Sequence, residues 1–146
     1  MPASGGNAVQ VSNSAGEAPQ ESPDGAWLYY VQSIVGASPL WRMPTSGGVP
    51  VKVLEGVDLA NFAVLDKGIY YIDRASGAVG VHYFDRTAGE TRLQYFDFAT
   101  RRSTTVARNL GNVAGVPLSA SKDGRTILYP RAESSVDDLM LVENFR

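Results

Sequence analysis

The chain has no cysteine, a single histidine, and no apolar run close to the roughly 20 residues that a membrane-spanning helix needs. Without cysteine it has neither disulfides nor thiolate metal ligands, a composition equally compatible with a reducing cytoplasm and with a cysteine-poor bacterial exterior. Residues 1–6 are small and uncharged, so we expect no secretion signal. We therefore expect no membrane insertion, and the compartment stays open.

An excess of charge of one sign is also missing. Lys and Arg number 13 against 15 Asp and Glu, which gives a net charge of −2. A nucleic-acid-binding surface needs a basic face, whereas Arg101 and Arg102 are the only adjacent basic pair and fit the solvated end of a hairpin. We therefore expect no nucleic-acid partner.

What the sequence does have is a recurring glycine turn. The three copies are Ser22–Gly25, Leu65–Gly68 and Ser121–Gly124, and each precedes a run of β-branched and aromatic residues. Such a turn predicts a hairpin, and we expect Gly25, Gly68 and Gly124 to have positive φ angles. Repetition at about 40–50 residues is typical of propeller or solenoid units.

Short strands are expected throughout, because no segment keeps a helical period over three turns. The first unit, residues 18–54, is predicted to hold Ala18–Ser22, Trp27–Ser33, Pro39–Met43 and Val51–Leu54. The second, residues 62–108, is predicted to hold Phe62–Leu65, Ile69–Asp73, Leu93–Phe98 and Ser103–Arg108. The third, residues 117–144, is predicted to hold Pro117–Ala120, Thr126–Pro130 and Leu139–Glu143. Four short antiparallel strands make up one propeller blade.

The strands are apolar on both faces. In the first unit Tyr29 and Val31 fall on one face, and Leu28 and Tyr30 on the other are also apolar. A sheet with one wet face alternates cleanly, whereas a sheet covered on both faces does not. We therefore expect each blade to lie between two neighbours.

A family resemblance follows from these residues. The run Ser22–Tyr30, followed by Leu40–Pro44 and the Gly47-Gly48 pair, resembles the repeat of TolB-type β-propellers, which also occurs in dipeptidyl-peptidase relatives and bacterial regulators. The segment Asp138–Phe145 is similar to the closing segment of such bacterial propellers. The resemblance implies six or more blades, a recognition platform, and a parent propeller outside the bacterial cytoplasm.

The strand count predicts assembly. Asn7–Ser12 is expected to be an outer strand that completes the last blade, giving three blades in one chain, below the usual four to eight. A homodimer would close a six-bladed ring, with Val9 and Val11 of one chain pairing with Leu139 and Leu141 of the other. The alternative is a cut piece of a longer sensor or hydrolase propeller.

The second unit is longer than the first. Asp24 and Asp66 are 42 positions apart and Asp66 and Asp123 are 57 apart, and we expect the excess to form an inserted hairpin at residues 74–90. This hairpin would rise beside the mouth of the central channel and present a candidate binding loop, which comprises His82, Tyr83 and Arg86. Its aromatic side chains could instead cover a neighbouring blade or the partner chain.

Catalysis has little support in the residues. His82 would have to serve any histidine-based scheme, and no Gly-x-Ser-x-Gly nucleophile motif is present. We therefore expect a non-catalytic binding and assembly module without cofactor or metal, which binds itself and a further protein or small ligand on its channel face. The alternative is a propeller hydrolase or lyase with a site in the central channel.

Overall fold

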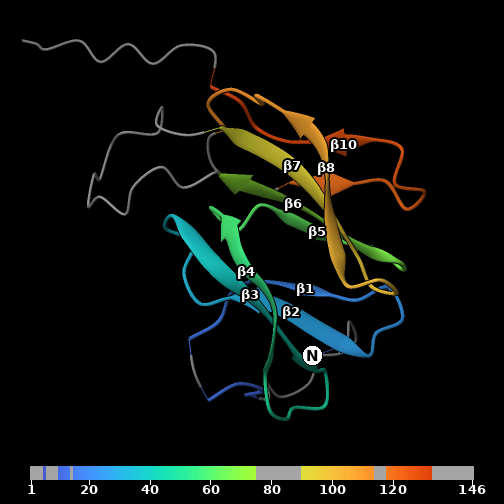
Figure 1. Ribbon diagram of the computed structural model, residues 1–146. Coiled ribbons are helices and arrows are strands. Elements are labelled where there is room, and N and C mark those ends of the chain that lie inside the picture. The colour runs from blue at the N-terminus through green and yellow to red at the C-terminus, as the bar shows by residue number, and fades with distance from the viewer. Residues whose placement is uncertain (1–4, 6–9, 14, 75–89, 114–117, 133–146) are drawn as a thin grey trace, which may run out of the picture.

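The computed structural model describes residues 5, 10–13, 15–74, 90–113 and 118–132. Within these residues the protein is all-β, with ten strands and no helix (Figure 1). The strands form two four-stranded antiparallel sheets and one two-stranded pair. The expected all-β class and its four-stranded antiparallel sheets are confirmed.

The first sheet has the order β1-β2-β3-β4. Its strands are β1 (Glu17–Glu21), β2 (Trp27–Val31), β3 (Ala37–Pro44) and β4 (Val51–Asp58). All four expected strands are present, and β3 and β4 are longer than predicted. They extend because Ala37 pairs with Asp58 beyond a register shift in the ladder.

The second sheet repeats this order as β5-β6-β7-β8. Its strands are β5 (Phe62–Val64), β6 (Gly68–Arg74), β7 (Thr91–Asp97) and β8 (Arg102–Arg108). The four strands match the prediction for residues 62–108.

The third unit begins with the pair β9 (Ser119–Ala120) and β10 (Ile127–Leu128). The strand expected at Leu139–Glu143 lies outside the described residues. Residues 10–12 are described and belong to no strand, so the outer strand expected at Asn7–Ser12 is not formed by that part of the chain.

The first and third turns are built from the same hydrogen bonds. Ser22 Oγ donates to Asp24 Oδ1 at 2.5 Å, and Trp27 N donates to Ser22 Oγ at 2.9 Å. The residues that repeat these contacts in the third turn are Ser121, Asp123 and Thr126. The serine hydroxyl, followed by a backbone N–H, holds the pKa of Asp24 below its usual value, and the same is true of Asp123.

The three turn glycines are not equivalent. Gly25 and Gly124 have φ angles of 72° and 67°, as expected. The φ of Gly68 is not positive, so that prediction was wrong. The second turn is tighter, since Leu65 N donates directly to Gly68 O at 2.8 Å. Glycine is needed there for space, because a Cβ would collide with the carbonyl oxygen of Phe96.

Two apolar clusters hold the units together. The first lies between the two four-stranded sheets and contains Tyr29, Val31, Leu40, Leu54, Val57, Ala60, Phe62, Ile69 and Tyr71. The second joins the second sheet to the third unit and contains Ala63, Ile72, Leu93, Leu110, Val113 and Leu118. The second sheet is apolar on both faces because a neighbouring unit covers each of them.

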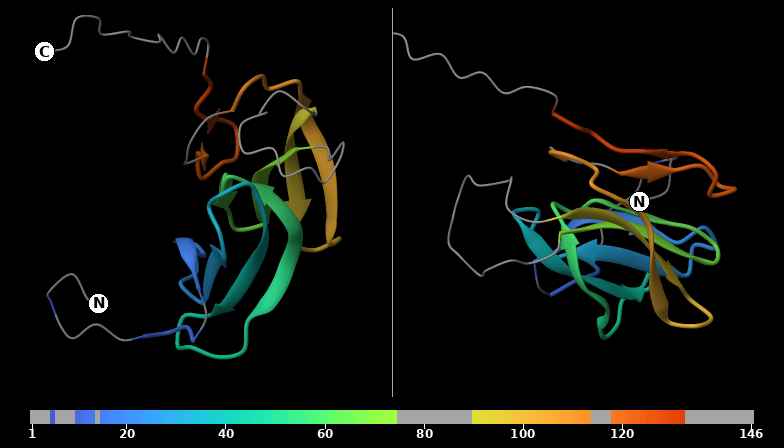
Figure 2. Two further views of the ribbon diagram at one scale, coloured as in Figure 1. Left: turned by 90° about the vertical axis from the view of Figure 1, so that its left-hand side faces the viewer. Right: turned by 45° about the horizontal axis from the view of Figure 1, so that its top comes forward.

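The units follow one another along an arc (Figure 2, left). Contacts join β1 to β5 and β5 to β9, so the first strand of each unit lies beside the first strand of the next. Gln20 of β1 links two units: its Nε2 donates to Phe62 O at 2.7 Å, and its Oε1 accepts from Val64 N at 3.3 Å. The Gln20 side chain is therefore both a hydrogen-bond donor and a hydrogen-bond acceptor to the backbone of β5.

Candidate functional site

The candidate binding loop belongs to the connection between β6 and β7. β6 ends at Arg74 and β7 begins at Thr91, and these two residues are paired, so the extra length separates the second and third strands of the second sheet. His82, Tyr83 and Arg86 themselves lie outside the described residues. Their role in binding stays a prediction.

The expected seam between chains is described only in part. Val9, Leu139 and Leu141 lie outside the described residues. Val11 is described and exposes 37% of its area. The pairing of these segments therefore stays a prediction.

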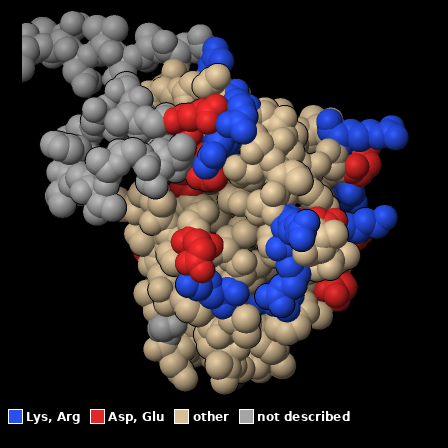
Figure 3. Space-filling model, viewed as in Figure 1, with Lys and Arg blue, Asp and Glu red and all other residues tan. Residues whose placement is uncertain are grey.

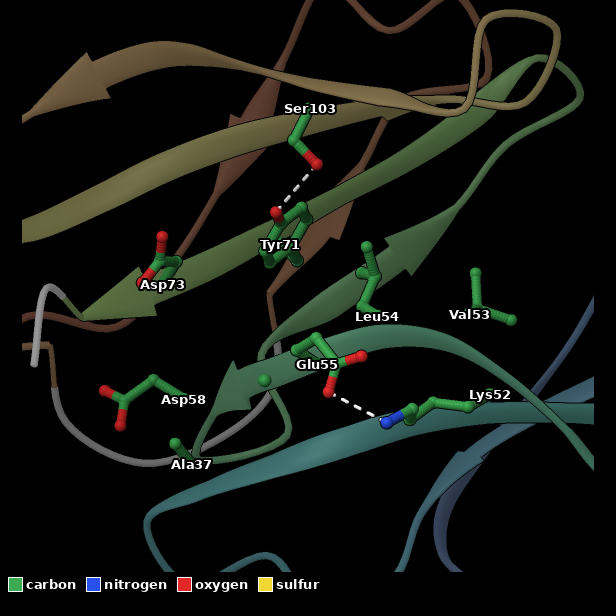
Figure 4. A pocket seen from close by; sticks show the side chains of 10 residues that line it. Ala37, Lys52, Val53, Leu54, Glu55, Asp58, Tyr71, Asp73 and Ser103 are labelled. Atoms are coloured by element: carbon green, nitrogen blue, oxygen red, sulfur yellow. Dashed lines mark hydrogen bonds and ion pairs between the residues drawn. The ribbon is translucent and has the colours of Figure 1, made fainter.

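A groove of about 510 Å³ lies between β4 and the second sheet (Figure 4). Its lining residues are Ala37, Lys52, Val53, Leu54, Glu55, Gly56, Asp58, Tyr71, Asp73 and Ser103. In Figure 4 the two aspartates lie at one end of the groove. The two sheets are joined where β4 contacts β6 and β1 contacts β5, and by the apolar cluster between them.

One wall of the groove is a hydrogen-bonded polar network. Tyr71 Oη donates to Ser103 Oγ at 2.9 Å. Asp73 Oδ2 accepts from Arg92 Nη2 at 2.6 Å and from Gln94 Nε2 at 3.2 Å. The wall therefore presents ordered polar groups, and the Asp73 carboxylate is held as an acceptor for its neighbours.

The hydroxyl of Tyr71 keeps its proton. Burial raises the pKa of Tyr71, and the hydrogen bond with Ser103 only partly opposes this effect. The phenol can thus donate a hydrogen bond across the whole physiological range of pH.

Sequence reasoning did not single out Asp73 or Gln94 as site residues. Both lie on the face of the second sheet that carries Tyr71, since Tyr71 pairs with Gln94. The available signal was the change from apolar to polar residues along that face of β6, where Asp73 follows Ile69 and Tyr71 at alternate positions.

A smaller hollow of about 290 Å³ lies between the second and third turns. Its lining residues are Leu65, Asp66, Lys67, Tyr70, Tyr95, Lys122, Asp123 and Gly124. Tyr70 Oη donates to Gly124 O at 3.2 Å, and the Tyr70 and Tyr95 rings are 4.8 Å apart. Burial raises the pKa of Tyr95, so this phenol also stays protonated. The hollow marks the joint between two units.

Charges of both signs are interleaved on the surface. Figure 3 shows basic and acidic side chains next to one another on the face that it presents. The described residues include the ion pairs Lys52–Glu55 at 2.8 Å and Arg108–Glu90 at 2.9 Å. Among the residues that the structure describes, no group of three His, Asp or Glu side chains is placed to hold a metal ion.

Comparison with protein-family models, with curated proteins and with solved structures finds no match for this chain. The described part of the chain contains no helix with the length and apolar character needed to cross a bilayer. The architecture and the groove are therefore the grounds on which a function is assigned.

Proposed function

We propose that this protein is a non-catalytic β-propeller module that contributes three blades, closes a six-bladed ring with a second copy of itself, and binds a partner on its loop-bearing face. The observation that carries the proposal is the repeated packing of one unit on the next. The units are joined by their first strands and by apolar faces in the same order along the chain.

The first strands support a radial arrangement. In a propeller the first strand of every blade lies nearest the central axis, so successive first strands are neighbours. Here β1 contacts β5 and β5 contacts β9. Gln20 reinforces this contact with two hydrogen bonds to the backbone of β5.

The alternation of side chains supports blades that face one another. Tyr29 and Val31 of β2 pack in the cluster between the first and second sheets. On β6, Ile72 belongs to the cluster shared with the third unit, and Tyr70 packs against that cluster. Tyr29 of β2 and Tyr70 of β6, at corresponding positions, thus both face the unit that follows their own.

We propose that a second copy closes the ring. Three blades fall below the usual four to eight, and an open arc leaves strand edges and apolar faces that invite pairing. We propose that residues 7–12 of one chain, of which residues 10–12 form no strand within a single chain, become a strand on assembly, pair with residues 139–142 of the other chain and complete the third blade. The resemblance to TolB-type repeats supports a ring of six.

The binding surface is proposed to be the face that carries the insertion at residues 74–90, with His82, Tyr83 and Arg86 as contact residues. The groove lined by Tyr71 and Asp73 provides ordered hydrogen-bonding groups at the junction of two blades. A protein loop or a small polar ligand fits this chemistry.

Sedimentation velocity of the full chain tests the assembly. We expect a species with twice the 15.6 kDa chain mass at micromolar concentration. Deletion of residues 1–12 should convert it to monomer or aggregate. A stable monomer of the full chain would contradict ring closure by a second copy, and it would favour a cut piece of a longer propeller.

A further inference from the structure

We infer that Leu128 of one copy packs against Leu28 and the Ser22–Gly25 turn of a second copy, so that the seam between chains repeats the contact between units within a chain. The inference rests on the proposed ring and identifies the surfaces that meet. Strand pairing makes three positions, one in each unit, equivalent.

The equivalent positions follow from the pairing next to each turn. The pairs nearest the three turns are Glu21 with Leu28, Val64 with Ile69, and Ala120 with Ile127. The next residue along each second strand is Tyr29, Tyr70 or Leu128. Of these, Tyr29 and Tyr70 point toward the unit that follows their own.

In the first two units this position is in contact with the turn region of the next unit. Tyr29 stacks on Phe98 at a ring distance of 6.2 Å, and Phe98 N donates to Lys67 O in the second turn. Tyr70 reaches the third turn and donates its hydroxyl hydrogen to Gly124 O. The side chain at this position is therefore an anchor between consecutive units.

Leu128 occupies the anchor position of the third unit but exposes 67% of its area, against 1% for Tyr29. The residues on either side of it, Ile127 and Tyr129, pack against the cluster shared with the second sheet. The face of β10 that carries Leu128 thus points away from the second sheet, toward the place where the following unit would stand.

The first unit has the matching surface. Its Leu28 is half-buried and corresponds to Ile69, which the preceding sheet covers completely. Residues Pro23 and Asp24 of its turn are exposed. On the same face Tyr30 is only 2% exposed, with Gly16 of the same chain beside its ring, so the surface left for a second copy is the end of the face that carries Leu28 and the turn.

A polar detail makes the two surfaces complementary. Gly25 corresponds to Gly124, whose carbonyl oxygen accepts a hydrogen bond from Tyr70 of the preceding unit. The carbonyl oxygen of Gly25 instead accepts from Thr45 Oγ1, within its own unit, at 2.9 Å. Leu128 has no hydroxyl that could donate a hydrogen bond, and the carbonyl oxygen of Gly25 already accepts one from Thr45. The apolar contact therefore buries no unpaired carbonyl.

The test compares Leu128→Asp with Val106→Asp, since Val106 is 52% exposed on β8, the edge strand of the second sheet, and is not part of the proposed seam. Burial of one leucine changes an equilibrium constant by about tenfold or more, and a two-fold dimer contains the contact twice. We expect Leu128→Asp to raise the dimer dissociation constant by about a hundredfold or more. Val106→Asp should leave it within about threefold of the wild-type value.

The outcomes separate this inference from the proposed function. A wild-type dimer whose dissociation constant is unchanged by Leu128→Asp overturns the seam but retains the ring. A monomeric wild type overturns both. Thermal melting of each variant shows whether a lost dimer reflects unfolding, and if Leu128→Asp is unfolded the cross-linking experiment decides.

Cross-linking is clean because the chain has no cysteine. A Leu128→Cys, Ser46→Cys variant, in which Ser46 is the exposed neighbour of Thr45, treated with a short bismaleimide should give covalent dimers in high yield. The matched control, Val106→Cys with Ser46→Cys, should stay uncross-linked. Equal yields from the two variants would contradict the inference. So would cross-linking of the Leu128→Cys variant to a different cellular protein in place of a second copy.

Discussion

Replacement of Gly68 by alanine should be far more damaging than the same change at a glycine with positive φ. A Cβ at Gly68 would collide with the carbonyl oxygen of Phe96 and lie 2.6 Å from the Tyr95 ring. Phe96 is paired with Ile69 in the β6–β7 ladder, so its carbonyl cannot move without loss of strand pairing. We expect Gly68→Ala to reduce the free energy of unfolding by about 3 kcal/mol or more.

Gly36 is the matched control. Its φ is 70°, and an added Cβ would meet nothing within 4 Å. Only the left-handed conformation penalises alanine there, by about 1–2 kcal/mol. The structure therefore ranks the steric cost at Gly68 above the conformational cost at Gly36.

Urea unfolding followed by circular dichroism measures both variants, with the midpoint and slope fitted separately. A difference of about 2 kcal/mol corresponds to roughly 4–8 °C in melting temperature for a chain of this size. If Gly68→Ala were as stable as Gly36→Ala, the tight second turn and its contact with Phe96 would be wrong.

Three further outcomes follow from the hydrogen bonds. Asp24 and Asp123 have pKa values below the ordinary 3.8, so they stabilise the fold fully above that pH and lose this contribution as pH falls through their folded values. In acid titrations followed by circular dichroism, the stability advantage of wild type over an Asp24→Asn, Asp123→Asn variant should therefore shrink below that pH, and a constant difference would contradict the turn geometry. Gln20→Glu should cost about 1–3 kcal/mol in urea unfolding, because the carboxylate cannot donate to the backbone of β5. Tyr71→Phe removes the bond to Ser103 and should cost about 1 kcal/mol, and an unchanged midpoint would show that this bond contributes nothing.

Most strands were predictable because their residues carry local signals. Trp27–Val31 and Ile69–Asp73 are runs of aromatic and β-branched residues that follow glycine turns, and both lie within strands of the structure. The longer β4 was not predictable, because Val57 and Asp58 pair with the start of β3 only beyond a register shift. That extension depends on a distant strand rather than on local sequence.

Turns with similar sequences have different backbone geometries in this structure. Asp66 and Gly68 resemble Asp24 and Gly25 in the sequence, but the two turns differ. The second is closed by the hydrogen bond from Leu65 N to Gly68 O, whereas the first is closed by the longer-range bond from Ser22 N to Trp27 O. In addition, Gly68 has no positive φ. The groove was also not predictable from local sequence. Tyr71 and Lys52 come from different sheets, and only the packing of the sheets places them on one groove.

Small-angle X-ray scattering of the full chain in solution tests the central claim most directly, because it reports mass and shape together. Closure of two three-blade chains into one ring predicts forward scattering for twice the 15.6 kDa chain mass and the distance distribution of a short, flat disc. Forward scattering of a single chain, or a dimer with the elongated profile of two arcs joined end to end, would contradict it.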